Sequence, residues 1–543
     1  MATIEVSKAE LTRLLKREIR LDFLVNRIEM LGMPVEKIEQ DKITLDISPN
    51  RPDFLSQYGI ARGLRNFLGI KKGLVNYEIK KSDYKVIVDP SLTNIRPFTA
   101  CCIIKNLDFT DEKIRDVIQF QEKLHATLCR NRKKAAIGVY PLEKIKLPIH
   151  FKAMNKEDIR FVPLDFGAEM NASEILKETD AGKKYWELLK DYKQYPVFID
   201  SNNKILSMPP IINSNTTGKI TSKTKDVFIE VSGFDLSFLN QVLNILVTTM
   251  TEMGGKIYTT NVSYSGKIYI MPNLMPSKMK LNSGYANKLL GLNLKENEIK
   301  NLLEKMGFSY SKGIVLIPAY RIDILHQFDL MEDIAIAYGY ENFNPATESF
   351  YSIAEENKIE ILKDKLRDLL IGMGFLEVNM PHLTNKENQN EKTNHSQELI
   401  SLKNSVNQEY NVLRGWLVPG LMEVTSNNKH NEYPQKIFEI GTVFKKEEHV
   451  NFAALITHSK ANLTEMKQVV DYILKTLNIK YEIKEKDQEI CFIPGRVAKI
   501  VFRGKEIGYF GEINPSVLEK WNLELPVAAC EINFSELFKI IGI

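Results

Sequence analysis

The chain has 543 residues, of which 44% are hydrophobic and 26% are charged. It is too long for a single hydrophobic core, so we expect three to five domains of ordinary globular composition, which excludes a disordered or fibrous chain. The net charge of +4 neither requires nor excludes a nucleic-acid partner.

The cellular compartment is indicated by what the sequence lacks. Its five cysteines form no C-x-x-C pair and show no zinc-type spacing with the eight histidines, so we expect buried thiols in a reducing cytosol. No apolar run approaches the ~18–20 residues that cross a bilayer, and the N-terminus does not resemble a signal peptide. The sequence therefore predicts a cytoplasmic protein with no membrane segment.

Residues 1–90 are predicted to form a small mixed α+β domain. Ser7 opens a helix with a capping box, and a second helix ends at Gly32. After a strand over residues 42–48 comes a turn with two prolines, in which Arg51 and Asp53 are expected to pair. The following segment indicates a helix despite its internal glycines.

Residues 91–268 are predicted to form a larger α/β domain. Strands are expected at 99–107, 134–139, 195–200 and 226–231, followed by a long apolar helix over 236–255. The polar side chains that mark a candidate site here are Asn213, Ser214, Glu230 and Ser232.

Two alternatives stay open in this domain. Glu230 and Ser232 lie two residues apart and share one face of a strand, which also fits an edge strand whose polar face meets water. The basic segment with Arg130, Arg132, Lys133 and Lys134 fits either a nucleic-acid patch or a solvated loop.

Residues 269–345 are predicted to form a small domain with an amphipathic helix at 299–306 and a strand at 314–320. Four carboxylates follow within eleven residues: Asp323, Asp329, Glu332 and Asp333. Side chains three and four residues apart share a helix face, and clustered hard oxygen ligands suit Mg2+. The alternative is a helix start with Asp329 at the N-cap and Glu332 at the third helical position.

Residues 346–543 are predicted to form the last domain. An amphipathic helix ends at Gly374, and the polar segment 386–398 is expected to be a mobile loop. Trp416 and Trp521 are expected to be core or interface anchors. The whole chain lacks the P-loop and Rossmann glycine motifs, the H-E-x-x-H zinc motif and the G-x-S-x-G nucleophile motif.

Eight separated segments carry a resemblance that covers essentially the whole chain. They are SPNRPDFLSQYGIARGL (Ser48–Leu64), RKKAAIGV (Arg132–Val139), PVFIDSNNKILSMPPIINS (Pro196–Ser214), FIEVSG (Phe228–Gly233), PAYRIDILHQFDLMEDIAIAYGY (Pro318–Tyr340), EYNVLRGWLVPGLME (Glu409–Glu423), PQKIFEIGTVF (Pro434–Phe444) and GEINPSVLEKW (Gly511–Trp521). Together they resemble the beta subunit of phenylalanyl-tRNA synthetase, of the archaeal and eukaryotic type.

This resemblance implies a class II synthetase-like core in residues 346–543 that has lost its ATP site. Class II enzymes grip ATP with one arginine on a strand and a later one after a glycine-rich strand. Here the strand at 436–444 carries Glu439 and no arginine, while Arg496 and Arg503 lack the glycine-rich strand. The chain alone is therefore not expected to activate an amino acid.

The resemblance also implies two sites and their partners. The four matching carboxylates would bind Mg2+ at the boundary with the alpha subunit, and residues 91–268 would be a tRNA-editing domain. Family members more often have FIDVTG, so Glu230 and Ser232 keep the chemical type but change the reach of the side chains. The editing candidates are Glu230, Ser232, Asn213 and Ser214.

The function implied is that of one subunit in an assembly of two alpha and two beta chains. The holoenzyme would attach phenylalanine to tRNA(Phe) with ATP, both small substrates binding through the alpha subunit. This subunit would supply the interface, tRNA contacts and hydrolysis of tyrosyl-tRNA(Phe), because a hydrophobic pocket rejects an added hydroxyl only about a hundredfold. Alternatives are a free-standing deacylase of mischarged tRNA and a non-enzymatic tRNA-binding protein.

Overall fold

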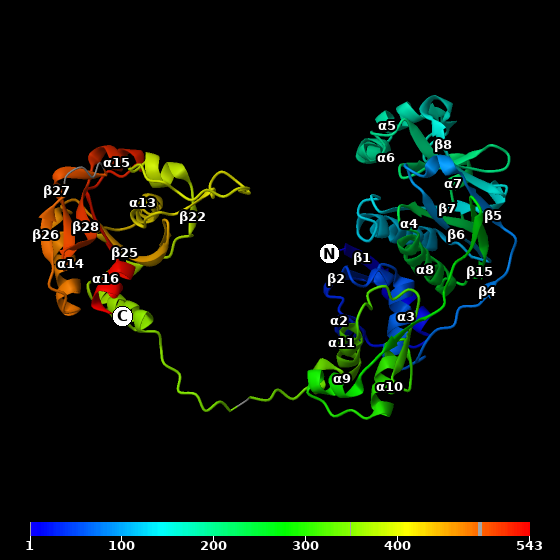
Figure 1. Cartoon of the computed structure of the whole chain (residues 1–543), viewed down its shortest axis with the longest axis horizontal. Helices are drawn as coiled ribbons and strands as arrows, with labels where there is room; N and C mark the ends of the chain where they lie inside the picture. The colour runs from blue at the N-terminus through cyan, green and yellow to red at the C-terminus, as the bar shows by residue number, and fades with distance from the viewer. Residues whose placement is uncertain (1, 348, 487–490, 543) are drawn as a thin grey trace. The chain divides into compact units, whose positions relative to one another are not determined.

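The structure is a computed structural model that describes residues 2–347, 349–486 and 491–542. The chain divides into two compact units, Met1–Ala346 and Thr347–Ile543, each with its own hydrophobic clusters (Figure 1). Several sheets, each accompanied by helices, confirm the multidomain mixed architecture. In the described residues, no helix is long and apolar enough to cross a membrane.

The start of unit 1 is an antiparallel sheet in the order β1-β3-β2 with three helices. Its elements are β1 (Ala2–Ser7), α1 (Lys8–Leu15), α2 (Leu21–Met30), β2 (Val35–Glu39), β3 (Lys42–Ile47) and α3 (Gln57–Phe67). Ser7 accepts a hydrogen bond from the backbone N–H of Glu10 and so caps α1 as expected. The expected pair in the turn also forms, because the Arg51 guanidinium donates to both carboxylate oxygens of Asp53 at 2.9 and 3.0 Å.

Two larger sheets follow in unit 1. One is β4-β15-β6-β14-β7, with β4 (Ile79–Lys80), β15 (Lys256–Tyr258), β6 (Phe98–Lys105), β14 (Val227–Gly233) and β7 (Ala135–Pro141). The other is β13-β12-β11-β8-β5-β16-β17, with β13 (Ile212–Asn213), β12 (Ile205–Met208), β11 (Gln194–Ile199), β8 (Ile149–Asn155), β5 (Lys85–Val88), β16 (Thr260–Tyr264) and β17 (Lys267–Met271).

Helices cover these sheets. They are α4 (Asp111–Ala126), α5 (Ala172–Glu178), α6 (Asp180–Tyr185), α7 (Asn215–Gly218) and α8 (Leu236–Glu252), with a two-stranded ribbon of β9 (Arg160–Phe161) and β10 (Met170–Asn171). The apolar α8 packs on β6 and β14, and α4 packs on β7. The four expected strands are all present, but β14 lies inside its sheet between β6 and β7 and is buried throughout. The edge-strand alternative for Glu230 and Ser232 is therefore wrong.

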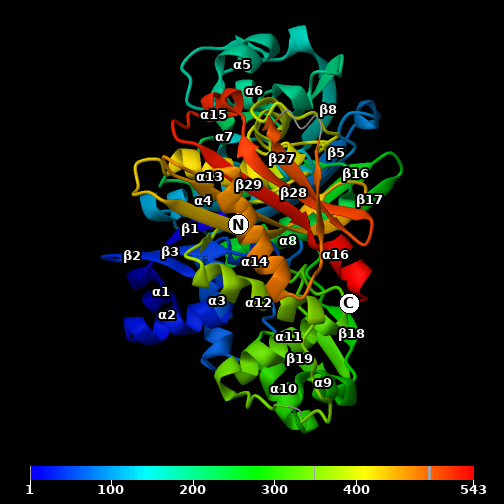
Figure 2. The same ribbon diagram turned by 90° about the vertical axis from the view of Figure 1, so that its left-hand side faces the viewer.

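Unit 1 ends in a three-stranded sheet, β18-β20-β19, with three helices. The elements are β18 (Ser277–Lys280), α9 (Ser283–Leu290), α10 (Glu296–Lys305), β19 (Ser309–Ser311), β20 (Ile314–Ile317) and α11 (Gln327–Tyr338), which gather together in both views (Figures 1 and 2). The N-cap of α11 is His326, and Asp329 is its third residue. The predicted helix start at Asp329 is thus wrong, because the capping box uses the carboxylate at the third helical position.

Unit 2 is built on a mostly antiparallel seven-stranded sheet, β21-β24-β25-β29-β28-β27-β26. Its strands are β21 (Leu376–Glu377), β22 (Leu383–Thr384), β23 (Val412–Leu413), β24 (Gln435–Phe444), β25 (Glu448–Thr457), β26 (Glu482–Glu485), β27 (Phe492–Phe502), β28 (Lys505–Ile513) and β29 (Val527–Asn533). Its helices are α12 (Lys358–Gly372), α13 (Val418–Asn427), α14 (Leu463–Thr476), α15 (Pro515–Lys520) and α16 (Phe534–Ile541).

The polar segment 386–398 differs from its prediction as a mobile loop. Residues Glu387–Glu391 form a turn of π-helix, and Asn388, Gln389 and Asn390 within it are buried. The Gln389 side-chain oxygen accepts from the Gly415 N–H at 2.9 Å, and its carbonyl accepts from the Trp416 indole. Polar composition predicted solvent exposure, but here the amides are buried because their hydrogen bonds are satisfied inside unit 2.

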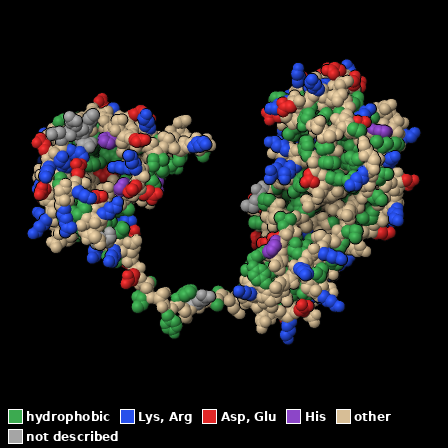
Figure 3. Space-filling model, in the orientation of Figure 1, with side chains coloured by type: hydrophobic (Ala, Val, Ile, Leu, Met, Phe, Trp, Pro, Cys, Tyr) green, Lys and Arg blue, Asp and Glu red, His purple; other side chains and the backbone are tan. Residues whose placement is uncertain are grey.

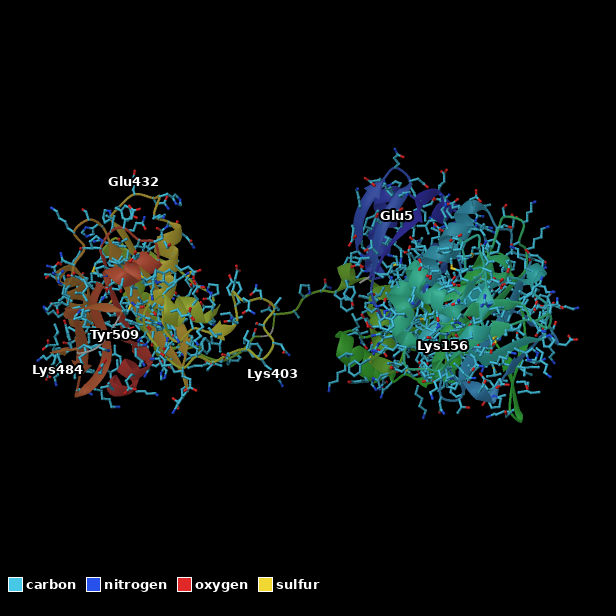
Figure 4. The ribbon with its side chains drawn as sticks, turned by 90° about the horizontal axis from the view of Figure 1, so that it is seen from above. Glu5, Lys156, Lys403, Glu432, Lys484 and Tyr509 are labelled. Carbon is cyan, nitrogen blue, oxygen red and sulfur yellow. The ribbon has the colours of Figure 1, made fainter. Side chains whose placement is uncertain are left out.

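The largest hydrophobic cluster of unit 1 runs from Ala2 to Ala337 and so crosses the predicted domain boundaries at residues 90 and 268. Both tryptophans expected to be anchors, Trp416 and Trp521, are buried in one cluster of unit 2. By contrast, the segment after residue 346 leaves the apolar side chains of Phe350, Tyr351 and Ile353 exposed. Hydrophobic side chains are visible along the extended segment between the two units in Figure 3. Charged side chains cover the outside of both units, such as Lys156 in unit 1 and Lys484 in unit 2 (Figure 4).

Candidate functional sites

Unit 1 contains a cavity of about 470 Å³ between α4, the strands β7 and β14, and the segment 209–220. Most of its wall is apolar, and includes Val117, Ile137, Val139, Pro210, Ile211 and Ile220. Two of the four editing candidates, Glu230 and Asn213, reach this wall. A cavity of this size, apolar with a few polar groups, is typical of a small-molecule site.

Glu230 is a buried polar group at the cavity wall. It is 2% exposed, and burial raises the pKa of its carboxyl to about 8, against the opposing charge of Arg96. Its Oε2 atom has no hydrogen-bond partner among the described residues. A protonated carboxyl with one free oxygen can both donate and accept a hydrogen bond, so it suits a neutral polar group of a ligand.

Tyr140 connects Glu230 to the other polar residues. Its hydroxyl lies 2.8 Å from Ser207 Oγ, 3.2 Å from Glu230 Oε1 and 3.4 Å from Asn213 Oδ1. Burial raises the pKa of the Tyr140 phenol, so the hydroxyl keeps its proton and donates to one of these acceptors at a time. Sequence reasoning missed Tyr140, which directly follows the segment Arg132–Val139, and Ser207, which lies within the segment Pro196–Ser214.

Gly138 allows the Tyr140 hydroxyl to lie close to the Glu230 carboxyl. A Cβ atom there would lie 2.2 Å from the Tyr140 hydroxyl and 2.5 Å from Glu230 Oε1, well inside contact distance. Gly138 pairs directly with Glu230 across β7 and β14. The glycine of the segment at 134–139 is therefore required by the site, which is a signal that the sequence already carried.

The remaining two editing candidates, Ser232 and Ser214, do not line the cavity. Ser232 accepts from Arg96 Nε at 3.1 Å through its hydroxyl and from Arg96 Nη2 at 2.5 Å through its carbonyl. Ser214 is buried, with its Oγ 2.9 Å from Thr216 Oγ1. Neither serine lines the cavity, so they hold the surrounding backbone and the buried Arg96 in place.

No nucleophile is activated by the histidine at the cavity wall. His125 Nε2 accepts from the Ile137 N–H at 2.8 Å, and its Nδ1 faces Glu122 at 3.2 Å. Burial lowers the pKa of His125, so both ring nitrogens are committed in the neutral form. Arg132, from the basic segment, bonds Glu122 and two backbone carbonyls near the cavity, so it is not part of a solvated loop.

The four acidic residues divide into two pairs. Arg321, which is buried, bonds Asp323 at 2.7 Å and Asp333 at 2.6 Å through the same nitrogen. Asp329 accepts from the N–H groups of Leu325 and His326 at 2.7 and 2.8 Å. Glu332 is exposed and lines a shallow hollow with Asp329.

This division limits what the acidic segment can hold. Within the described residues, no three His, Cys, Asp or Glu side chains lie close enough to hold a metal ion. Asp323 and Asp333 do not fit as free ligands, since both are already bonded to Arg321. Asp329 and Glu332 remain, and Mg2+ commonly takes one or two protein carboxylates and several waters.

In unit 2, Glu439 of β24, the strand expected to carry no arginine, is paired with Arg414, which directly follows β23. Arg414 Nη1 donates to Glu439 Oε1 at 2.6 Å, and both side chains are almost fully buried. Arg496 pairs with Glu512 at 2.7 Å, and Arg503 bonds the Ile540 carbonyl. All three arginines are thus engaged with the chain itself.

Comparisons with known proteins define the class and then the family. Residues 279–340 match the tRNA synthetase B5 domain, and residues 346–534 match the phenylalanyl tRNA synthetase beta chain CLM domain. The chain is therefore of the tRNA-synthetase class.

Relatives and a solved structure identify the family. The phenylalanine--tRNA ligase beta subunit of Pyrococcus abyssi is 39% identical, covering 99% of this chain and 100% of the relative. That of Archaeoglobus fulgidus is 40% identical over 95% of each chain. An N-terminal fragment of the phenylalanyl-tRNA synthetase beta-subunit from Pyrococcus horikoshii covers 62% of this chain and 100% of its own, with a TM-score of 0.60 and 40% identity. The chain belongs to the family of phenylalanine--tRNA ligase beta subunits.

Proposed function

We propose that this chain acts with an alpha subunit, in an assembly of two alpha and two beta chains, to attach phenylalanine to tRNA(Phe) with ATP. The observation that carries this proposal is near-complete alignment with relatives named as beta subunits. Synthesis is assigned to the partner, because the strand at 436–444 carries Glu439 and no arginine, and because Arg496 and Arg503 do not follow a glycine-rich strand.

Mixing the chain with its own alpha subunit tests this role. We expect a larger complex that charges tRNA(Phe), while the purified chain alone shows no phenylalanine-dependent ATP–pyrophosphate exchange. Exchange by the chain alone would contradict the proposal. Deacylation of mischarged tRNA without the partner, together with no complex formation, would favour a free-standing deacylase.

The cavity in unit 1 is proposed to hydrolyse tyrosine from mischarged tRNA(Phe). Its apolar wall accommodates an aromatic ring, and Glu230 Oε2 is a buried polar atom without a partner that can bond the tyrosine hydroxyl. Phenylalanine would leave that atom unpaired, which discriminates strongly against it. Since His125 is committed to the backbone, a positioned water is the expected nucleophile.

Variants of Glu230 test the editing proposal in the reconstituted holoenzyme. Glu230→Ala should slow deacylation of tyrosyl-tRNA(Phe) about tenfold or more, while phenylalanine charging changes little. Tyr140→Phe, which removes the hydroxyl bonded to Glu230, should give a smaller loss in the same direction. Glu157→Ala, an exposed carboxylate of the same unit, is the matched control. Equal deacylation in all variants would place editing elsewhere.

Mg2+ is proposed to bind Asp329 and Glu332, with water and groups of the alpha subunit completing its shell. Support comes from the shared hollow and from the exposure of Glu332, whereas Asp323 and Asp333 serve to hold Arg321. Glu332→Gln should weaken binding of Mn2+, followed as a spectroscopic substitute for Mg2+. Glu341→Gln, another exposed carboxylate shortly after the same helix, should not. Identical Mn2+ titrations would contradict this site.

A further inference from the structure

A basic surface lies at the edge of the five-stranded sheet that is farthest in strand order from β7 and the cavity. Figure 1 labels β4 and β15, the strands of this edge. Strand β15 lies between β4 and β6 there, with Lys80 opposite Tyr258 and Lys256 opposite Lys105. Side chains alternate along a strand, so these four residues share one face of the sheet. The other face carries Ile79, Ile257 and Ile104, and there Ile257 and Ile104 are buried in the core.

The segment between β4 and β5 adds to this face. Lys81, Tyr84 and Lys85 line an open hollow of about 620 Å³ together with Tyr258. The segment is fixed by backbone bonds: the Ser82 N–H donates to Thr259 Oγ1 at 2.9 Å, and Tyr84 accepts from the Asn261 N–H at 2.8 Å. Its lysines are therefore presented from ordered backbone.

Aromatic rings hold the more buried lysine in place. Lys105 Nζ lies 5.1 Å from the ring centre of Tyr84 and 5.0 Å from that of Tyr258, within cation–π range. The neighbouring Tyr84 hydroxyl also raises the pKa of Lys105, so the ammonium stays charged.

The charge of this surface is not balanced within the chain. Like charges directly opposite on neighbouring strands, such as Lys105 and Lys256, destabilise a sheet. Among the described residues, none of the lysines at positions 80, 81, 85, 105 and 256 has a carboxylate oxygen within 4.0 Å. Asp83 lines the hollow and Asp226 acts on Lys105 from farther away, but the lysines outnumber them.

We propose that this surface, formed by Lys80, Lys81, Lys85, Lys105 and Lys256 around Tyr84 and Tyr258, binds the phosphate backbone of tRNA. The inference rests on the proposed function, which supplies a tRNA substrate, and it adds where on this chain the RNA lies. Lysines neutralise phosphates without reading sequence, and release of counterions makes such binding salt-dependent. A polyanion also relieves the repulsion between the facing lysines.

The test compares two triple variants of the chain assembled with its alpha subunit, using unmodified tRNA(Phe) transcript as the probe. In one, the exposed Lys81, Lys85 and Lys256 become Ala; in the control, the exposed Lys177, Lys183 and Lys190 become Ala. Both lose three positive charges. The first should lower tRNA affinity about tenfold or more at 0.1 M KCl and reduce the slope of log K against log[salt] by about two to three. The control should change neither.

Other results of the same experiment also support or overturn the proposed tRNA surface. Replacing the same three lysines with Arg should keep affinity, which shows that charge and not packing is responsible. Wild-type tRNA affinity in both triple Ala variants, or an equal loss of tRNA affinity in both, overturns the proposal that this surface binds tRNA. Loss of assembly with normal tRNA binding overturns it in favour of an acidic protein contact. Failure of the wild-type assembly to bind tRNA overturns the proposed function as well.

Discussion

Burial decides the charge of Glu230 and therefore what this residue can recognise. With its pKa near 8, the carboxyl is neutral at pH 7 and offers both a donor and an acceptor to a ligand. An exposed glutamate on the same strand would be ionised and would attract cations instead. The identity of the residue thus predicts less about the site than its surroundings do.

Stability should report this proton directly. The folded carboxyl titrates at about 8 and the unfolded one near 4.5, so its stabilising contribution is complete below pH 4.5 and is lost as the pH rises toward 8. Glu230→Gln cannot ionise. Relative to this variant, the wild type should lose free energy of unfolding between pH 5 and 8.5, measured by urea unfolding of unit 1. Parallel profiles for the two proteins would show that Glu230 is ionised in the fold.

Arg321 is expected to contribute strongly to the stability of the fold, because its buried side chain bonds two aspartates. Arg321→Met leaves Asp323 and Asp333 buried without their cation, which should lower the free energy of unfolding by roughly 3–5 kcal/mol. Arg20→Met removes an exposed pair with Asp22 and should have no measurable effect. Thermal unfolding of both variants checks this. A small effect of Arg321→Met would mean that the two aspartates have another partner, such as a metal ion.

At the level of residues, the spacing along the sequence predicted which side chains lie close together, but it predicted their tertiary partners poorly. Arg51 and Asp53 were expected to pair because only Pro52 of the turn separates them, and they do pair. The acidic cluster was expected to be shared by one ligand, but Arg321 separates Asp323 and Asp333 from Glu332. A helical period says which side chains share a face, whereas the tertiary packing of α11, which contacts α10 and α9, decides which of them meet a buried arginine.

The helix α3 depends on small residues that let it approach the preceding turn. A Cβ atom at Gly59 would lie 1.8 Å from the backbone oxygen of Asp53. This closeness places Arg62 of α3 over the Tyr320 ring at 3.6 Å and beside Asp53. The internal glycine therefore joins the turn at residue 51 to the segment that leads into the acidic residues.

Adding a methyl group at Gly59 should separate these elements. Gly59→Ala gains helix propensity but clashes with backbone, so we expect a loss of about 2 kcal/mol or more in the free energy of unfolding. Gly372→Ala, at the exposed end of α12 with nothing within 4 Å of the new atom, should raise it by up to about 1 kcal/mol. Urea unfolding of each variant compares the two. A stabilising Gly59→Ala would mean that α3 can shift without loss.

The helices and strands were predicted better than the contacts between them. Amphipathic periods gave the helices at 299–306 and 358–374, and β-rich runs gave β6, β7, β11 and β14, because these patterns are local. The central position of β14 could not be predicted, since its partners β6 and β7 lie far away in sequence. The same is true of the cavity, whose wall combines α4, β14 and the segment 209–220.

At the scale of the molecule, hydrophobic burial defines the two units. Each cluster among the described residues lies within one unit, and a relative's N-terminal fragment has been solved alone. The predicted boundaries at 90 and 268 followed changes in composition. They do not coincide with gaps in the core, because the cluster of unit 1 joins residues from Ala2 to Ala337.

Truncation should therefore give opposite results at two positions. A fragment of residues 1–346 keeps its whole core and should unfold cooperatively at the temperature of the unit 1 transition in the full chain. A fragment of residues 1–268 loses the part of the same cluster that includes Phe308, Leu330 and Ile334, and exposes the surface that they cover. It should unfold at a much lower temperature or aggregate. Calorimetry of both fragments decides, and a stable 1–268 fragment would mean that the core divides where the composition does. Because Tyr140 and Glu230 lie before residue 268, loss of cooperative folding in the shorter fragment would also show that the fold around the cavity depends on residues 269–346 for its stability.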